Sequence, residues 1–211
     1  MDYRRLKKGL VEIATKNNVT IHEVRTKDVL VSEWVRWKCQ FGCKGYAKHL
    51  SCPPYVPGLE KTRELLAEYH KAYLIRFAGI PGMTDTDLGS MPKNWHHFLK
   101  GLIVWIHETI YELEQHAFYQ GYYKALGFAA YPCIFCDECA AEQMQGVVDL
   151  SVKRNCPHGE KVRTSMEAAG IDVFATVRKA GLPISVVPCK NNEYGMITTT
   201  EINSYGLLLI E

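Results

Sequence analysis

The chain has 211 residues, of which 47% are hydrophobic and 23% are charged. This composition supplies enough apolar side chains for one substantial core or two small ones. The 25 basic and 23 acidic residues nearly balance, and the only dense basic run is Arg4-Arg5-Leu6-Lys7-Lys8, which we interpret as the solvated face of a helix. Nucleic-acid binders usually show a clustered basic face, so we expect no nucleic-acid partner.

The pattern of apolar residues gives no signal for secretion or membrane insertion. The first residues are charged and no apolar segment follows them. The most apolar stretch, residues 102–106, is far too short to span a bilayer. We therefore expect a cytoplasmic protein without a membrane partner. In such a chain, eight cysteines indicate metal or redox chemistry more than disulfide bonds.

The first third of the chain changes from helical to extended and then to irregular patterns. Apolar residues recur at helical spacing over residues 3–17. Residues rich in β-branched and aromatic side chains predict strands near 21–25 and 33–37. The stretch 39–57 has no periodicity and holds three cysteines, two glycines and several prolines, which is typical of a loop. A helix is predicted over 58–70.

The middle of the chain contains the longest predicted helix. A short apolar run predicts a buried strand at 72–77, and the turn-rich residues 79–92 predict a linker or flap. A broad apolar stripe then predicts a helix over residues 94–126, which Gly121 or Gly127 interrupts or ends.

The last third again mixes helices and strands. Residues 131–162 are irregular and hold four cysteines. The elements predicted after them are a helical turn at 164–169, a helix at 172–180 ended by Gly181, a strand at 184–187 and a closing strand pair at 196–200 and 207–210. Because βαβ alternation is absent, we predict an α+β fold. It is a single domain over residues 1–211, with a mixed or antiparallel sheet, a long central helix and two cysteine-rich metal loops, 39–57 and 131–162.

The stronger cysteine motif is Cys133-Ile-Phe-Cys136-Asp-Glu-Cys139, followed after sixteen residues by Cys156-Pro157. Three thiolates at this spacing can wrap the chain around one corner of a cubane and reach three different irons. Bacterial-type ferredoxins use the same run before a Cys-Pro pair. The gap before Cys156 is much longer than in ferredoxins, so the sequence leaves the fourth ligand open.

Zinc is the main alternative for this motif. A zinc ion takes four ligands in a tetrahedron, usually from two separated pairs. Cys136, Cys139, Cys156 and His158 are one set that fits this rule. Buried thiols without a metal are the third interpretation, because free cysteine is often buried. Three cysteines two residues apart suit an iron–sulfur cluster better than a single zinc ion.

A second motif, Cys39-Gln-Phe-Gly-Cys43 and then Cys52-Pro53-Pro54, offers three more thiolates. They are predicted to hold three corners of a second cluster, with Cys156, Cys189 or no residue at the fourth iron. An open iron is a Lewis acid that can take a substrate oxygen, nitrogen or sulfur. A zinc or packing role is the alternative. Cys189 stands alone on or after a strand and is equally well explained as a small core residue.

Other polar residues near the cysteines are candidates to support a site rather than to ligate. They are Tyr46, Lys48 and His49 between Cys43 and Cys52, and Arg163, Ser165 and Glu167 after Cys156. Such residues can hydrogen-bond to ligands, cluster sulfurs or an anionic substrate. Solvated charges and helix capping are the simpler interpretation. We expect structural or exposed roles for the histidines of the long predicted helix, His96, His97, His107 and His116.

Several motifs together resemble one known family. They are Val35–Cys39, Cys43-Lys-Gly-Tyr46, Leu50–Tyr55, Tyr122–Ala125, Pro132–Cys139, Cys156-Pro157, Arg163–Ala168, Gly170–Phe174 and Tyr205-Gly206-Leu207. The chain resembles DUF2284, a family of predicted metal-binding proteins of unknown function, over nearly its whole length. The resemblance implies a metal, with iron–sulfur favoured, and implies no substrate. The chain departs from the family pattern in its longer Cys139–Cys156 gap and in Thr164, where the pattern has proline.

These observations lead to three functional hypotheses. The first is a protein with one or two [4Fe-4S] clusters that acts in electron transfer or as a redox accessory, with Cys39, Cys43, Cys52, Cys133, Cys136, Cys139 and Cys156 as ligands. The second is an enzyme that uses an open cluster iron held by Cys39, Cys43 and Cys52. The third is a structural zinc-binding module. We expect a redox partner protein or a small-molecule substrate, and a homodimer is an open alternative because the long apolar helix can bury its stripe between two copies.

Overall fold

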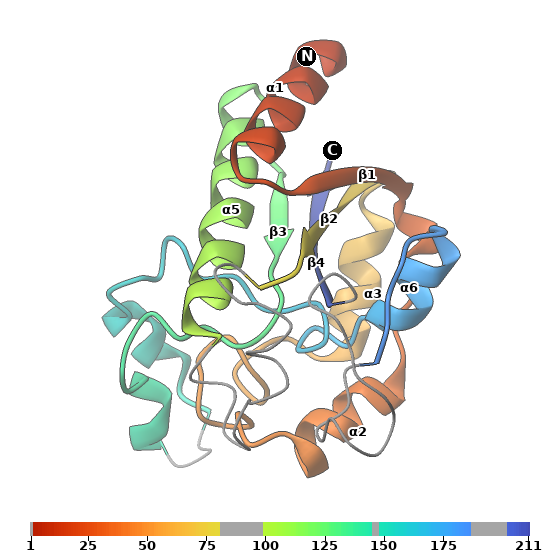
Figure 1. Ribbon diagram of the computed structural model, residues 1–211. Helices are drawn as coiled ribbons and strands as arrows, with labels where there is room; N and C mark the ends of the chain where they lie inside the picture. Colours follow the sequence, from red (N-terminus) through yellow and green to blue (C-terminus); the bar gives the residue numbers. More distant parts are fainter. Residues whose placement is uncertain (1, 81–98, 145–147, 187–201) are drawn as a thin grey trace.

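The computed structural model describes residues 2–80, 99–144, 148–186 and 202–211 (Figure 1). A four-stranded antiparallel sheet in the order β1-β2-β4-β3 forms its centre. The strands are β1 (Thr20–Arg25), β2 (Lys71–Ala78), β3 (Leu126–Phe128) and β4 (Asn203–Ile210). The α-helices of the described residues are α1 (Tyr3–Lys16), α2 (Glu33–Gly42), α3 (Leu59–Ala67), α5 (Lys100–Tyr119) and α6 (Val173–Lys179). This arrangement confirms the predicted α+β fold of a single domain.

The central strand pair joins the middle of the chain to its last described segment. β4 pairs with β2 over eight residues, from Lys71 opposite Ile210 to Ala78 opposite Asn203. On its other edge β4 pairs with the short β3. Seven of the eight β4 residues are buried, because helices cover both faces of the sheet. Strands buried on both faces need apolar side chains at successive positions, and β2 and β4 have them.

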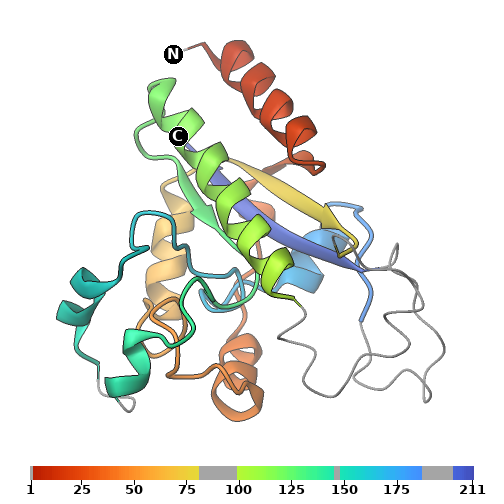
Figure 2. The same cartoon turned by 60° about the vertical axis from the view of Figure 1, so that its left-hand side comes forward.

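The two faces of the sheet carry different helices. Figures 1 and 2 show α1 and α5 crossing one face, while α3 and α6 lie on the other. The core on the first face contains Leu6, Leu10, Tyr73, Ile75, Ile106, Ile110, Leu208 and Ile210. The core on the second face contains Leu66, Leu74, Val173, Val177, Leu207 and Leu209. Successive residues of β4 therefore alternate between the two cores, as strand geometry requires.

Most of the predicted elements are confirmed where the structure describes them. The confirmed elements are the helices at 3–17, 58–70 and 172–180, the strands at 21–25, 72–77 and 207–210, and residues 100–119 of the long helix. Gly121 ends α5 and Gly181 follows α6, both with positive φ, 95° and 71°. Glycine adopts this conformation without steric cost, so it commonly ends helices.

The predicted strand at 33–37 is wrong, because these residues form the start of α2. Their aromatic and β-branched side chains favour a strand, but contacts to distant residues favour a helix. The indole N–H of Trp34 donates to Asp172 Oδ2 at 3.0 Å, and the Arg36 guanidinium donates to the Ala168 carbonyl oxygen at 2.6 Å. Cys39 is thus helical, and the irregular part of the first predicted loop begins at Cys43.

The predicted strand at 184–187 is also wrong in its described part, because residues 184–186 have no regular structure. Several predictions fall outside the described residues: the linker or flap beyond residue 80, the helix start at 94–98, the strand at 196–200, Cys189, His96 and His97.

Candidate metal centre

The first cysteine segment combines the end of a helix with a series of tight turns. Cys39 lies in the last turn of α2, Cys43 is the exposed residue that follows the helix, and Cys52 is 8% exposed. Backbone hydrogen bonds close the chain between them, including Tyr46 N–H to the Cys43 carbonyl at 3.2 Å and Ala47 N–H to the Pro53 carbonyl at 2.9 Å. This folding brings Cys52 back toward the helix end that carries the other two thiols.

The second cysteine segment leaves β3 and passes beyond the same end of the sheet (Figure 1). Two short 3-10 helices, η3 (Ala140–Met144) and η4 (Leu150–Asn155), lie between Cys139 and Cys156. Both of these cysteines pack against one small apolar cluster, formed by Leu50, Tyr55 and Ala141. The long Cys139–Cys156 gap is therefore folded back on itself, and Cys156 returns to the three-cysteine motif.

The two segments are also fixed to each other. The backbone N–H of Cys133 donates to Ser51 Oγ at 3.0 Å, and Thr164 Oγ1 donates to the Ser51 carbonyl oxygen at 3.0 Å. The hydroxyl of the buried Tyr55 donates to the Ala47 and Ala141 carbonyl oxygens, at 3.3 and 3.4 Å. Contacts at Ser51 and Tyr55 thus hold the two cysteine segments side by side.

Electrostatic coupling divides the seven described cysteines into two groups. Burial raises the pKa of the Cys52 thiol to about 12, and negative charge at Cys43 and Cys39 adds to the shift. Burial raises the pKa of Cys133 to about 11, and negative charge at Cys156, Cys139 and Cys136 adds to it. The groups are therefore Cys39, Cys43 and Cys52, and Cys133, Cys136, Cys139 and Cys156. Cys52 also feels the charge of Cys133, which places the groups next to each other.

With these pKa values, the Cys52 and Cys133 thiols keep their protons at neutral pH unless a metal binds them. A metal centre binds thiolates, and its positive charge reverses the cost of ionising several neighbouring thiols. In the described part of the chain, no three Cys, His, Asp or Glu side chains converge closely enough to hold one metal ion as they stand. The grouping of the thiols therefore rests on their shared packing and their electrostatic coupling.

The chain matches the family model of DUF2284, described as a predicted metal-binding protein, over residues 22–210. The chain belongs to this family. The search of curated proteins gives no match, and the search of solved structures gives none. Within the described residues of this DUF2284 protein, every helix is too short or too polar to cross a membrane.

A cavity of about 250 Å³ opens beside the first thiol group of this DUF2284 protein. Its lining consists of Trp34, Val35, Lys38, Cys39, Cys43, Glu167, Ile171, Val173 and Phe174. Glu167 Oε2 is inaccessible to solvent and has no hydrogen-bond partner among the described residues. Burial is the main cause of the raised pKa of the Glu167 carboxyl. A carboxyl that can carry a proton therefore lies in the wall that also contains two of the candidate ligands.

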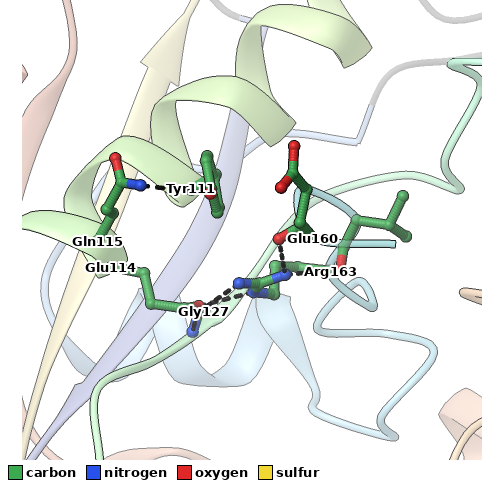
Figure 3. A network of polar contacts seen from close by, with 7 residues as sticks. Tyr111, Glu114, Gln115, Gly127, Glu160 and Arg163 are labelled. Atoms are coloured by element: carbon green, nitrogen blue, oxygen red, sulfur yellow. Dashed lines mark hydrogen bonds and ion pairs between the residues drawn. The ribbon is translucent and has the colours of Figure 1, made fainter. Parts of the chain in front are cut away.

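Arg163, a candidate for contact with a cluster or substrate, makes a structural ion pair instead. Figure 3 shows its guanidinium facing the Glu114 carboxylate of α5, with N–O distances of 2.5 and 2.7 Å. Glu114 also accepts a hydrogen bond from the Gly127 N–H of β3 at 2.6 Å. Arg163 donates as well to the Glu160 and Val162 carbonyl oxygens. The pair anchors the end of the second cysteine segment to the helix and the sheet.

His107 of α5 is fully buried, which is compatible with the structural role expected for it. Its ring packs at an angle against Phe135, which lies between Cys133 and Cys136, and Phe135 in turn contacts His158. Among the described residues, neither ring nitrogen of His107 has a hydrogen-bond partner of normal geometry. The backbone of Tyr131 raises the pKa of the ring and so offsets part of the lowering that burial causes. Burial lowers the pKa of His107 to about 4, so the ring is neutral at pH 7.

Removing the Arg163–Glu114 pair should destabilise the protein measurably. The two side chains are only 18% and 14% exposed, and Arg163→Ala leaves the Glu114 carboxylate without its bidentate partner. We expect a loss of about 2–4 kcal/mol and a thermal midpoint lower by roughly 5–10 °C, measured by circular dichroism. Lys61→Ala is the matched control, because it breaks an exposed pair with Glu64 that solvent screens, so its midpoint should stay close to the wild-type value. Equal midpoints for the two variants would contradict the anchoring role.

The low pKa of His107 predicts a stability loss in mild acid. The unfolded chain takes up a proton at this residue below about pH 6.5, whereas the folded protein resists protonation down to about pH 4. Stability from the neutral ring is therefore present above pH 6.5 and lost as the pH falls toward 4. Between pH 7 and pH 5, the free energy of unfolding measured in urea should fall by about 2 kcal/mol more for the wild type than for His107→Leu.

His107→Asn, which has no titrating ring but keeps a polar group, should show the same weakened pH dependence as His107→Leu. A wild type and two variants with parallel pH profiles would show that His107 does not cause the acid sensitivity.

Proposed function

We propose that this DUF2284 protein binds two iron–sulfur clusters and acts in electron transfer. In the proposal, Cys133, Cys136, Cys139 and Cys156 hold one [4Fe-4S] cluster, while Cys39, Cys43 and Cys52 bind three irons of a second. The observation that carries the proposal is the return of Cys156 to the Cys133–Cys139 motif. It packs with Cys139 on one apolar cluster, and its charge adds to the rise that burial causes in the pKa of Cys133 and Cys136.

The residues around the second group supply what such a site needs. Cys-x2-Cys-x2-Cys is the spacing that lets three thiolates reach different irons of one cubane. The partly buried thiols and the apolar side chains of Leu50, Tyr55 and Ala141 would limit solvent access, which influences reduction potential. Zinc is the weaker choice, because a zinc ion usually takes its four ligands from two separated pairs, whereas this group has three cysteines two residues apart.

Two adjacent clusters suit a protein that passes electrons through its own interior. The contacts at Ser51 place Cys52 of the first group beside Cys133 of the second. An electron that enters at one group could then leave at the other over a short distance. The adjacency supports electron transfer as the activity, rather than two independent structural sites.

Metal and sulfide analysis of anaerobically purified protein tests the cluster assignment. The wild type should be brown and contain about eight irons and about eight acid-labile sulfides per chain. Cys156→Ala should lose about half of this iron, because it removes the fourth ligand of one cluster. Cys189→Ala should retain the full content, because the proposal gives the second cluster no fourth protein ligand, and a loss of iron in this variant would identify Cys189 as that ligand. Colourless protein with stoichiometric zinc and no sulfide would replace the proposal with a structural zinc module.

A second candidate function is supported by the cavity at Cys39 and Cys43. Three thiolates leave one iron of a cubane without a protein ligand, and such an iron supplies Lewis acidity to a bound oxygen, nitrogen or sulfur. The chain's own contributions would be a proton held at the buried Glu167 carboxyl and a positive charge at Lys38. The cavity of about 250 Å³ limits the substrate to a small molecule.

Mild oxidation distinguishes an open iron from a fully ligated cluster. If the first group leaves one iron unprotected, ferricyanide should remove about one iron per chain and leave a three-iron cluster visible by electron paramagnetic resonance, and added ferrous iron should restore the original state. Glu167→Gln should retain the same iron content, since the carboxyl is not a ligand in the proposal. Retention of all the iron in the oxidised protein would reject the open position.

A further inference from the structure

The outer face of α2 is unusually apolar for a surface helix. Trp34, Trp37 and Phe41 are 44%, 64% and 73% exposed. Their spacing of three and four residues places them on one stripe of the helix. The opposite side contains Val35, which is buried, and Cys39, which is half-buried. Surface helices normally turn such large apolar residues toward the core, so this exposed stripe is a candidate binding surface.

The aromatic stripe is held in place by its own contacts. Trp34 is fixed by its hydrogen bond to Asp172, and the Lys38 ammonium lies 5.0 Å from the centre of the Trp34 ring. Trp37 and Phe41 stack with their ring centres 5.5 Å apart. Rings that are already ordered lose little conformational entropy when a partner covers them. The stripe therefore has the preorganised aromatic side chains that protein interfaces favour.

The charge that follows Trp34 along the chain is positive, whereas Glu33 at the start of α2 is paired with Arg63. Residues 34–59 contain no Asp or Glu but include Arg36, Lys38, Lys44 and Lys48. Arg36 is occupied by the Pro57 and Ala168 carbonyl oxygens, whereas the three lysines are exposed. Within the described part of the chain, none of these three lysines forms an ion pair. A complementary partner would present carboxylates around an apolar centre.

The position of this surface relates it to the first thiol group. Cys39 belongs to the same helix, and the exposed Cys43 directly follows it. A protein seated on Trp37 and Phe41 would thus lie against the segment that, in the proposed function, holds a cluster. Electron transfer needs such close approach, and electron-transfer complexes typically use small interfaces that form and separate quickly.

We infer that the outer face of α2, together with Lys38, Lys44 and Lys48, docks a small acidic one-electron carrier protein. This inference rests on the proposed function, because the electron needs an iron–sulfur centre at Cys39, Cys43 and Cys52 as its acceptor. One electron passes from the reduced carrier, which is oxidised, to that centre, which is reduced, and no bond is broken. The aromatic stripe supplies contact area, and the lysines guide the acidic partner to it.

Charge reversal tests the docking surface. The double variant Lys38→Glu/Lys44→Glu is compared with Arg5→Glu/Lys8→Glu, which makes the same change in net charge on the exposed side of α1, at the far end of the molecule (Figure 1). The probe is a reduced acidic two-cluster bacterial ferredoxin. Surface plasmon resonance under anaerobic conditions should show Kd raised at least about tenfold at low salt for the α2 variant only. The difference should shrink as ionic strength rises.

A second double variant distinguishes the contribution of apolar contact area from that of electrostatic attraction. Trp37→Ala/Phe41→Ala should weaken ferredoxin binding at low and high salt alike, mainly by faster dissociation, because it removes buried contact area. Stopped-flow reduction by ferredoxin should slow in both α2 variants. Reduction by dithionite, which needs no docking, should proceed at the wild-type rate in Trp37→Ala/Phe41→Ala, which leaves the charge near the cysteines unchanged.

The outcomes keep this inference distinct from the proposed function. Protein without iron and sulfide would remove the proposed function and, with it, this partner. Iron-loaded protein that dithionite reduces normally, but that binds ferredoxin equally well in all variants, would overturn the docking surface alone. Binding of single-stranded RNA or anionic lipid vesicles at the α2 face, in place of ferredoxin, would also overturn it.

Discussion

The pairing of β4 with β2 is the constraint on which the rest of the structure depends. β4 consists of residues 203–210 and lies in the interior of the sheet, with both faces covered by helices. Neither helical layer has a complete surface to pack on until this strand is in place. Because the strand consists of residues 203–210 and its partners of residues 71–78 and 126–128, the support of the cysteine segments depends on contacts between distant parts of the chain.

The cysteine segments, in contrast, carry an energetic cost, because their buried thiols are difficult to ionise. Packing of Cys52 and Cys133 away from water stabilises their neutral thiols and raises the free-energy cost of the thiolates. A multivalent metal centre bound by these thiols would remove this cost and link several segments at once, which would couple metal binding to local folding. The small apolar cluster around Tyr55 and the hydrogen bonds of Ser51 keep the thiols near one another. This preorganisation lowers the entropy that a bound centre would have to overcome.

The sequence singled out the two cysteine segments, whose role as ligands stays a prediction, but it did not indicate which residues support them. The cysteine motifs identify their own members because ligand spacing is a local property. The role of Arg163 was not evident, since its partner Glu114 lies forty-nine residues away on α5. The helix at 33–42 was missed for the same reason. Trp34, Val35 and Trp37 belong to the aromatic and β-branched types that favour strands, and contacts to Asp172 and Ala168 decide the conformation.

The sequence by itself determined the apolar periodicity that specifies the sheet and most of its helices, the two cysteine motifs and the membership of a metal-binding family. These features depend on residues close together in the chain. Only the tertiary structure decided that Cys156 returns to Cys139, that the two thiol groups are neighbours, and that Glu167 and Cys39 share a cavity wall. Those outcomes depend on contacts between residues far apart in the sequence, and such contacts form only when the chain packs around its central strand pair.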